Sequence, residues 1–254
     1  MNVNSWLKQA SKITTRLDAE IFMMTVLGKE DRSDLVLCAE QDLVEDELKM
    51  LDMMVELRLR RVPVAYIIGK KEFYGRDFKV NRDVLIPRPE TENIIGLVKE
   101  MNVEGKTIVD VGTGSGCIAI TLALETDAAE IIGIDKSLKA LRVAQDNADE
   151  LRAKVKFIAS DLLDDYHGVA DIVVANLPYV DRKWEWTSPE IKYEPEMALF
   201  AEEDGLALIY RLIDGCEAEY LILEADPSQH EKIVNYAKKY KLVKRENYIL
   251  LFQK

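Results

Sequence analysis

The sequence has few residues of the types that build disulfide frameworks, zinc sites and histidine-based catalysis. Its 254 residues include three cysteines, Cys38, Cys117 and Cys216, and two histidines, His167 and His230. No Cys-x-x-Cys pair is present, so neither a disulfide framework nor a zinc ribbon is supported. A histidine-based metal site and a Ser-His-Asp triad are equally unsupported, and we expect no metal cofactor.

Long hydrophobic runs and an excess of positive charge are also missing. No stretch reaches the roughly 18 apolar residues that span a bilayer, and residues 1–20 lack the apolar core of a signal peptide. We therefore expect a cytoplasmic protein without a membrane partner. The net charge is −12, from 34 Lys and Arg against 46 Asp and Glu. Such a field repels a polyanion, so stable nucleic-acid binding is not expected.

What remains is a globular composition, 48% hydrophobic and 31% charged. Residues 1–66 are poor in Gly and Pro and carry apolar stripes at helical spacing, which predicts a small helical-bundle domain. One such stripe is Leu17, Ile21, Met24 and Leu27. Aromatic and β-branched residues around Gly69 and Gly75 predict a β-hairpin linker over 67–86.

From residue 87 to residue 254, apolar strands alternate with amphipathic helices. The runs TIVDV, EIIGID and DIVVA are almost continuously β-branched or apolar. Strands of this kind are buried on both faces, as in parallel sheets covered by helices. The predicted fold class is α/β, a Rossmann-like domain with a doubly wound, mostly parallel sheet.

A glycine-rich loop, DVGTGSG, follows the first of these strands and opens a helix. Glycine lacks a Cβ, so a ligand can lie directly on the backbone. The carboxylate at the start of the loop would repel a pyrophosphate, but it suits the sulfonium and amino groups of S-adenosylmethionine. The predicted cofactor-binding residues of this loop are Asp110, Gly112, Thr113, Gly114, Ser115 and Gly116.

Two further acids end the next strands. Asp135 lies about 20 residues beyond the loop, where a carboxylate accepts both ribose hydroxyls of an adenosyl cofactor. That position alone does not separate a nicotinamide cofactor from S-adenosylmethionine. Asp161 is placed to accept from an adenine amino group, and Leu162 to pack on the ring. Acids at three successive strand ends, together with the loop, predict S-adenosylmethionine as the cofactor.

The fourth strand ends in Asn176-Leu177-Pro178-Tyr179. This element suits methyl transfer to a planar nitrogen, whose delocalised lone pair attacks poorly. The Asn176 side-chain oxygen is predicted to accept one N–H, and a main-chain carbonyl at Leu177 or Pro178 the other. Pro178 fixes the backbone and has no competing N–H, and Tyr179 would cover the planar group. We predict Asn176, Pro178 and Tyr179 as catalytic residues, and Asn176 also as part of the cofactor site.

With these motifs the chain resembles the protein-(glutamine-N5) methyltransferases of the HemK/PrmC type, which modify peptide chain release factors. The resemblance covers most of the chain. Leu177 stands where the family has a proline. The matching segments are residues 61–74, the loop 86–92 (IPRPETE), 110–116, 176–179, 193–195, 198–199 and 204–206.

The resemblance implies a function and a site. The family transfers a methyl group from S-adenosylmethionine to the glutamine of the Gly-Gly-Gln motif in release factors, which modulates translation termination. It implies that the amino-terminal helical domain docks this protein substrate. The implied substrate-binding residues are Asn176, Leu177, Pro178 and Tyr179, with Phe73, Arg88, Pro89 and Glu90 shaping the pocket mouth.

Two other functions remain open at this point. The first is methylation of a different planar nitrogen, adenine N6 of RNA or DNA or a ribosomal-protein glutamine. Asn-Leu-Pro-Tyr is the form seen in ribosomal RNA adenine dimethyltransferases, and a basic cluster within 58–71 could contact RNA. The second is a non-catalytic scaffold that binds the cofactor.

Overall fold

The computed structural model describes residues 1–184 and 188–254, and the chain forms two compact units. Unit 1 contains Met1–Gly69 together with Ser188–Tyr193. Unit 2 contains the remaining described residues. Within the described ranges, no helix has both the length and the apolar character needed to cross a membrane.

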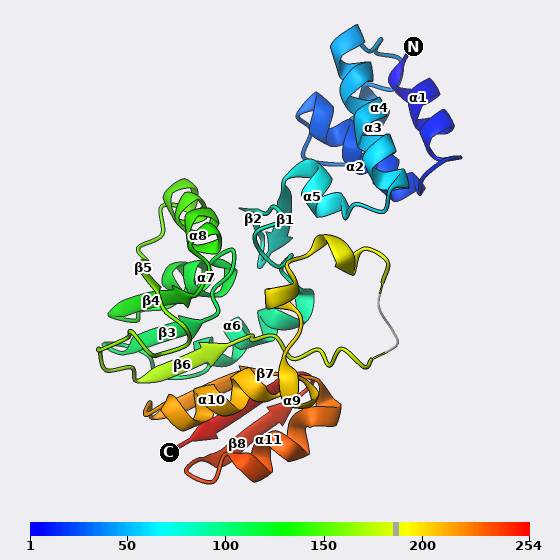
Figure 1. Ribbon diagram of the computed structural model, residues 1–254. Coiled ribbons are helices and arrows are strands. Elements are labelled where there is room, and N and C mark those ends of the chain that lie inside the picture. Colours follow the sequence, from blue (N-terminus) through cyan, green and yellow to red (C-terminus); the bar gives the residue numbers. More distant parts are fainter. Residues whose placement is uncertain (185–187) are drawn as a thin grey trace. The chain divides into compact units, whose positions relative to one another are not determined.

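Unit 1 is helical (Figure 1). Asn2 and Thr15 begin the first two helices by accepting the backbone N–H groups of Ser5 and Asp18 on their side chains. The core holds apolar side chains such as Trp6, Phe22, Met23, Leu51 and Met54. The helices are α1 (Val3–Ala10), α2 (Arg16–Leu27), α3 (Asp34–Leu37), α4 (Glu45–Leu59), α5 (Val64–Ile68) and the 3-10 helix η2 (Ile191–Tyr193).

The buried face of α2 differs from the predicted stripe. Leu17 is 51% exposed, whereas Ala19, Phe22 and Met23 are fully buried. These three residues lie at i, i+3 and i+4, so they form a competing stripe of the same period. The ring of Phe22 and the thioether of Met23 lie in the core. The predicted stripe is therefore wrong at Leu17.

The hairpin is shorter than the predicted range. Residues 67 and 68 belong to α5, which ends at Gly69 with a φ of 77°. The strands are β1 (Lys70–Phe73) and β2 (Arg76–Lys79), and they pair antiparallel. The tract up to residue 86 is not a strand. A short helix therefore takes the apolar residues that the sequence pattern assigned to a strand.

Unit 2 is an α/β domain around one large sheet. Its remaining elements are η1 (Pro89–Thr91), α6 (Glu92–Lys99), β3 (Thr107–Val111), α7 (Cys117–Glu125), β4 (Glu130–Asp135), α8 (Leu138–Leu151), β5 (Lys156–Ala159), β6 (Ile172–Ala175), η3 (Glu196–Ala198), α9 (Glu202–Gly205), α10 (Ala207–Gly215), β7 (Tyr220–Glu224), η4 (Pro227–Gln229), α11 (His230–Tyr236), β8 (Lys241–Glu246) and β9 (Ile249–Gln253).

The sheet has the strand order β5-β4-β3-β6-β7-β9-β8. Strands β3 to β7 run parallel, and β9 runs antiparallel between β7 and β8. Helices α6 and α7 and one end of α8 pack on one face, and α10 and α11 pack on the other (Figure 1). The predicted Rossmann-like, doubly wound and mostly parallel fold is confirmed.

The parallel strands all end at one edge of this sheet. In the register, Val111 of β3 lies beside Ile134 of β4 and Ala175 of β6. Ala175 in turn lies beside Leu223 of β7. The residues that follow these strand ends therefore gather at one edge, where open α/β sheets bind ligands.

Candidate active site

A cavity of about 320 Å³ opens at the carboxyl edge of the sheet. This volume falls in the range of about 300 to 1,000 Å³ that small-molecule sites occupy. The cavity brings together residues from four consecutive strand ends. The predicted residues that line it are Gly112, Gly114, Asp135, Asp161, Leu162, Asn176, Leu177 and Pro178.

Gly112 begins the loop after β3 and lies against the element after β6. Its N–H donates to Ile134 O at 2.8 Å, which fixes the turn on the neighbouring strand. Its φ is 78°, and a Cβ there would lie 3.0 Å from Leu177 Cδ2. A side chain at this position would be strained and would crowd the space between loop and motif. The glycine keeps this part of the cavity open to a ligand.

Asp135 ends β4 and holds the glycine loop. Its Oδ2 accepts from Gly114 N at 2.9 Å, and its Oδ1 accepts from Ser137 N at 2.8 Å. Burial raises the pKa of this carboxyl, and these backbone N–H groups act against that shift. A carboxylate oxygen has two lone-pair sites, so each oxygen retains acceptor capacity toward a ligand hydroxyl.

Asp161 and Leu162 follow β5 on another wall of the cavity. Asp161 Oδ2 accepts from Lys136 Nζ at 2.6 Å, and its Oδ1 lies 3.4 Å from the Arg211 guanidinium. The lysine bond is the main reason that the pKa of Asp161 is lowered. Leu162 has a φ of 57°, a conformation that is uncommon for a branched residue. This turn directs an apolar side chain to the cavity.

Asp110 does not line the cavity, which differs from the role predicted for it. Its side chain is fully buried beneath the loop, where Oδ2 accepts from Thr113 Oγ1 at 2.6 Å and Ala119 N at 3.2 Å. Its Oδ1 has no hydrogen-bond partner among the described residues. Burial raises the pKa of Asp110 to about 7. Its observed contacts therefore tie the loop to the first turn of α7.

The other buried loop residues also serve the loop itself. Thr113 is 4% exposed and Ser115 is 2% exposed, and neither reaches the cavity. The carbonyl of Ser115 accepts from Asn147 Nδ2 at 2.9 Å. Gly116 is the residue from which α7 starts, and it has a φ of 81°. Gly112 and Gly114 of the loop thus line the cavity, whereas the side chains of the loop are buried in the protein.

The element after β6 is held from several sides. Asn176 Nδ2 donates to Thr91 Oγ1 at 2.9 Å. The Tyr179 hydroxyl donates to Glu224 Oε1 at 3.4 Å, and the Tyr179 carbonyl accepts from Gln229 Nε2 at 2.8 Å. A Cβ on Gly205 would lie 2.1 Å from that carbonyl, so the glycine is needed for this approach. The Asn176 side-chain oxygen and the carbonyls of residues 177 and 178 are the other hydrogen-bond acceptors of the motif.

Comparison with known proteins identifies the family. Residues 95–190 match the methyltransferase small domain, and residues 3–69 match the PrmC N-terminal domain. The release factor glutamine methyltransferase of Bacillus subtilis (strain 168) is 42% identical over 207 residues, which are 77% of this chain and 72% of that protein. The chain belongs to the release factor glutamine methyltransferases.

A second relative supports this placement. The release factor glutamine methyltransferase of Buchnera aphidicola subsp. Schizaphis graminum is 35% identical over 253 residues, 94% of this chain and 92% of that protein. A solved structure of the E. cuniculi Mtq2–Trm112 complex matches with a TM-score of 0.51 at 19% identity, covering 68% of this chain and 99% of that one. The latter likeness concerns the fold. The chain is an S-adenosylmethionine-dependent methyltransferase.

The cavity residues fit this cofactor. Gly112 leaves room that a Cβ would fill, Asp135 retains acceptor sites, and Leu162 adds an apolar wall. The side of the cavity toward Lys136 and Arg211 carries positive groups, both already paired with Asp161. The donors and acceptors thus match an adenosyl ligand with hydroxyl and amino groups.

The residues predicted to shape the pocket mouth lie elsewhere. Phe73 is 1% exposed and packs edge-on against Phe78, with ring centroids 6.0 Å apart, so it belongs to the core of this methyltransferase. Arg88 donates to the buried Glu194 at 2.6 Å. Pro89 and Glu90 are exposed and do not line the cavity. The charge of Glu90 nevertheless acts on the motif through Glu224, whose pKa it raises.

Two residues that touch the motif were missed from the sequence. Thr91 accepts from Asn176, and Glu224 accepts from Tyr179. A signal for Glu224 was present, because it ends the strand YLILE and parallel strands end at one edge. Thr91 lies inside the loop 86–92. The resemblance to the family covers this loop but implied no role for Thr91.

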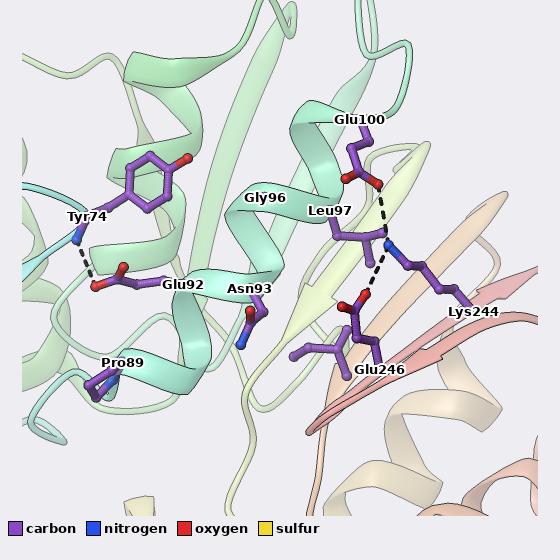
Figure 2. Close-up of a pocket in the computed structure, with 10 residues that line it drawn as sticks. Tyr74, Pro89, Glu92, Asn93, Gly96, Leu97, Glu100, Lys244 and Glu246 are labelled. Carbon is purple, nitrogen blue, oxygen red and sulfur yellow. Dashed lines mark hydrogen bonds and ion pairs between the residues drawn. The ribbon is translucent and has the colours of Figure 1, made fainter.

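A second cavity, of about 380 Å³, lies along α6 and next to β8 and β9. Figure 2 shows Lys244 reaching Glu100 at 3.4 Å and Glu246 at 3.1 Å, and Glu92 accepting from Tyr74 N at 3.1 Å. None of the polar residues that follow the parallel strands lines this second cavity. We therefore assign the methyltransferase site to the strand-end cavity.

Proposed function

We propose that the strand-end cavity transfers a methyl group from S-adenosylmethionine to the side-chain amide nitrogen of the glutamine in the Gly-Gly-Gln motif of release factors. The observation that carries the proposal is that the cofactor loop and the motif line one cavity. The position of a Cβ on Gly112 is 3.0 Å from Leu177, so the cofactor loop and the acceptor-bearing motif line one space.

The cofactor would be held by the residues that follow β3 to β5. The backbone at Gly112 and Gly114 would let the ligand lie close, Asp135 would accept from its ribose, and Leu162 would cover its base. S-adenosylmethionine supplies an electrophilic methyl group on a positively charged sulfur. Asp110, Thr113, Ser115 and Gly116 would act by holding the loop in shape.

The motif after β6 would hold the glutamine. An amide nitrogen is a poor nucleophile because its lone pair is delocalised into the carbonyl. The Asn176 oxygen would accept one N–H and the carbonyl of Leu177 or Pro178 the other, which localises the lone pair and aims it at the methyl group. As the N–C bond formed, the bond between the methyl group and the sulfur would break and leave a neutral thioether. The nitrogen would become acidic only then and would release its proton to solvent.

The ring of Tyr179 would cover the planar amide, and Pro178 would keep the backbone open to it. The hydroxyl of Tyr179 and its carbonyl are already occupied by Glu224 and Gln229. Tyr179 is therefore expected to act by shape and not as a base. Burial and the nearby Glu224 charge raise the pKa of its hydroxyl, which agrees with that role.

The helical domain, unit 1 of the fold, would dock the protein substrate, and the hairpin of β1 and β2 follows it along the chain. Val36 and Leu37 of α3 are 76% and 87% exposed. Adjacent exposed apolar side chains are a feature of protein-binding surfaces. With a net charge of −12, the chain is better suited to a protein partner in the cytoplasm than to an anionic membrane surface or a nucleic acid.

The basic cluster favours protein over RNA as the substrate. Arg58 pairs with Asp18 at 2.8 Å and with Glu190 at 2.6 Å. Arg60 pairs with Glu56. Cations that are already paired with carboxylates release fewer counterions from a phosphate backbone, so they contribute less to RNA binding.

A competition experiment tests the proposal. The purified chain is incubated with S-adenosylmethionine carrying a radioactive methyl group and an equal mixture of release factor, ribosomal subunits and DNA. We expect the label in release factor, and none in a release factor whose Gly-Gly-Gln glutamine is changed to alanine. Label in RNA, DNA or a ribosomal protein, with none in release factor, would overturn the proposed substrate.

A further inference from the structure

The amide of Asn176 is fixed by two buried side chains from other parts of unit 2. Thr91 ends η1 and is 2% exposed, and its Oγ1 accepts from Asn176 Nδ2 at 2.9 Å. Glu224 ends β7 and is 1% exposed. The pairing of Ala175 with Leu223 brings the next residues, Asn176 and Glu224, to adjacent strand ends.

Glu224 is a buried acid placed among hydrogen-bond donors. Its Oε1 accepts from the Tyr179 hydroxyl at 3.4 Å, while its Oε2 has no hydrogen-bond partner among the described residues. Burial is the main cause that raises the pKa of Glu224 to about 7, and the charge of Glu90 adds to it. The pairing of β6 with β7 puts Asn176 and Glu224 side by side in sequence register, and the side chains of Thr91 and Asn176 lower the pKa of Glu224.

These neighbours distinguish the two ends of the Asn176 amide. An asparagine side chain has a donor end, the NH₂ group, and an acceptor end, the oxygen, and the two have nearly the same shape. When ionised, Glu224 accepts and does not donate. A Thr91 hydroxyl that gives its single proton to this carboxylate has only acceptor sites left for Asn176. The pattern therefore stabilises one orientation, with Nδ2 toward Thr91 and Glu224 and Oδ1 away from them.

We propose that Thr91 and Glu224 are positioning residues that hold the Asn176 oxygen toward the substrate nitrogen. This inference rests on the proposed function, in which that oxygen accepts a substrate N–H. The reversed amide would present its own N–H groups to the substrate N–H₂ group, so the acceptor would be lost. The chemistry would then slow although every residue of the motif was still present.

Thr91→Val tests the inference, because valine keeps the shape and removes the hydroxyl. The matched control is Thr121→Val on α7, since Thr121 is also fully buried and its hydroxyl has no partner among the described residues. We expect kcat for the methylated acceptor to fall roughly 10- to 100-fold in Thr91→Val, as for other misaligned reacting groups. We expect the KM for the acceptor and the Kd for the cofactor to change much less, and Thr121→Val to match wild type.

A second variant separates positioning from packing. Thr91→Ser keeps the hydroxyl and loses the methyl group, so it should restore most of the activity that Thr91→Val loses. A Thr91→Ser enzyme as slow as Thr91→Val would overturn the inference, because the methyl group would then be what matters. A Thr91→Val enzyme with the kcat of wild type would overturn it as well.

Glu224→Gln covers the case in which Thr91→Val does not fold. The carboxamide has the same shape but can turn its NH₂ group toward Asn176 or Thr91, which favours the reversed amide. We expect a lower kcat with an unchanged cofactor Kd and an intact thermal unfolding transition, whereas a wild-type kcat would contradict the positioning role.

All variants are assayed on whichever acceptor the wild-type chain labels. A wild type that leaves release-factor glutamine unlabelled refutes the proposed function, and unaltered variants refute only this inference.

Discussion

The two halves of the candidate site are built differently. At the cofactor half, Asp135 has both carboxylate oxygens bonded to backbone N–H groups, and Asp161 is paired with Lys136 and Arg211. At the substrate half, Glu224 is buried with one oxygen unpartnered among the described residues. Each carboxylate of the first half has partners on both oxygens. The second half has fewer side-chain bonds and contains the oxygen that would accept from the substrate, so single changes there should alter the chemistry more than cofactor binding.

Asp110 gives the largest expected effect on stability. Its pKa is about 7 in the folded protein and near 3.8 when exposed, so between these values the folded state holds a proton that the unfolded state has released. The free energy of unfolding must then fall as pH rises through this window, by up to about 4 kcal/mol. Asp110→Asn removes this titration.

Denaturant unfolding of wild type and Asp110→Asn at several pH values checks this expectation. The advantage of wild type over the variant should shrink as pH rises from about 4 to about 7. The exposed Asp127→Asn serves as the control and should run parallel to wild type. A pH-independent difference between Asp110→Asn and wild type would show that folding does not raise the pKa of Asp110.

Asp135→Ala should have the next largest effect, this time on cofactor binding. The change removes the predicted ribose acceptor and the bonds to Gly114 and Ser137, and we expect the binding free energy to weaken by roughly 1–3 kcal/mol. Calorimetric titration with S-adenosylmethionine measures it. Glu130→Ala, at the exposed opposite end of the same strand, should leave the Kd unchanged. Equal affinity in Asp135→Ala and wild type would remove Asp135 from the cofactor site.

Lys136→Ala should have the smallest effect. The Lys136 side chain is 64% exposed, and exposed ion pairs contribute about 0–1 kcal/mol. We expect the cofactor Kd to change by less than about 5-fold in the same titration. A much larger loss would mean that Lys136 itself contacts the ligand, and the contrast between the two halves of the site would need to be revised.

Much of the architecture followed from pattern alone. The β-branched strands, the loop 110–116 and the acids at successive strand ends predicted the parallel sheet and the edge where the cavity lies. These signals are local, because a buried strand and a glycine turn are each encoded within a few residues. Asp135, Leu162 and Asn176 do line the predicted cavity.

The errors arose where distant packing decides the outcome. Asp110 alternates with Val109 and Val111 along β3, so its side chain faces away from their side of the sheet and lies under α7. In α2 the stripe through Ala19, Phe22 and Met23 competed with the predicted one. Ser188–Tyr193 folds with unit 1, and the Tyr193 hydroxyl donates to the Arg60 carbonyl there. No local sequence pattern predicts this association.

The role of the Asn176 oxygen is tested most directly by mapping methylation with Asn176→Ala. Release factor is treated with wild type, with Asn176→Ala or with Asn235→Ala, which changes an exposed asparagine on α11, and the modified residue is located by mass spectrometry. We predict one methyl group on the Gly-Gly-Gln glutamine with wild type and Asn235→Ala. With Asn176→Ala we predict a rate lower by at least about 100-fold at unchanged cofactor affinity. Full methylation of that glutamine by Asn176→Ala would contradict the account.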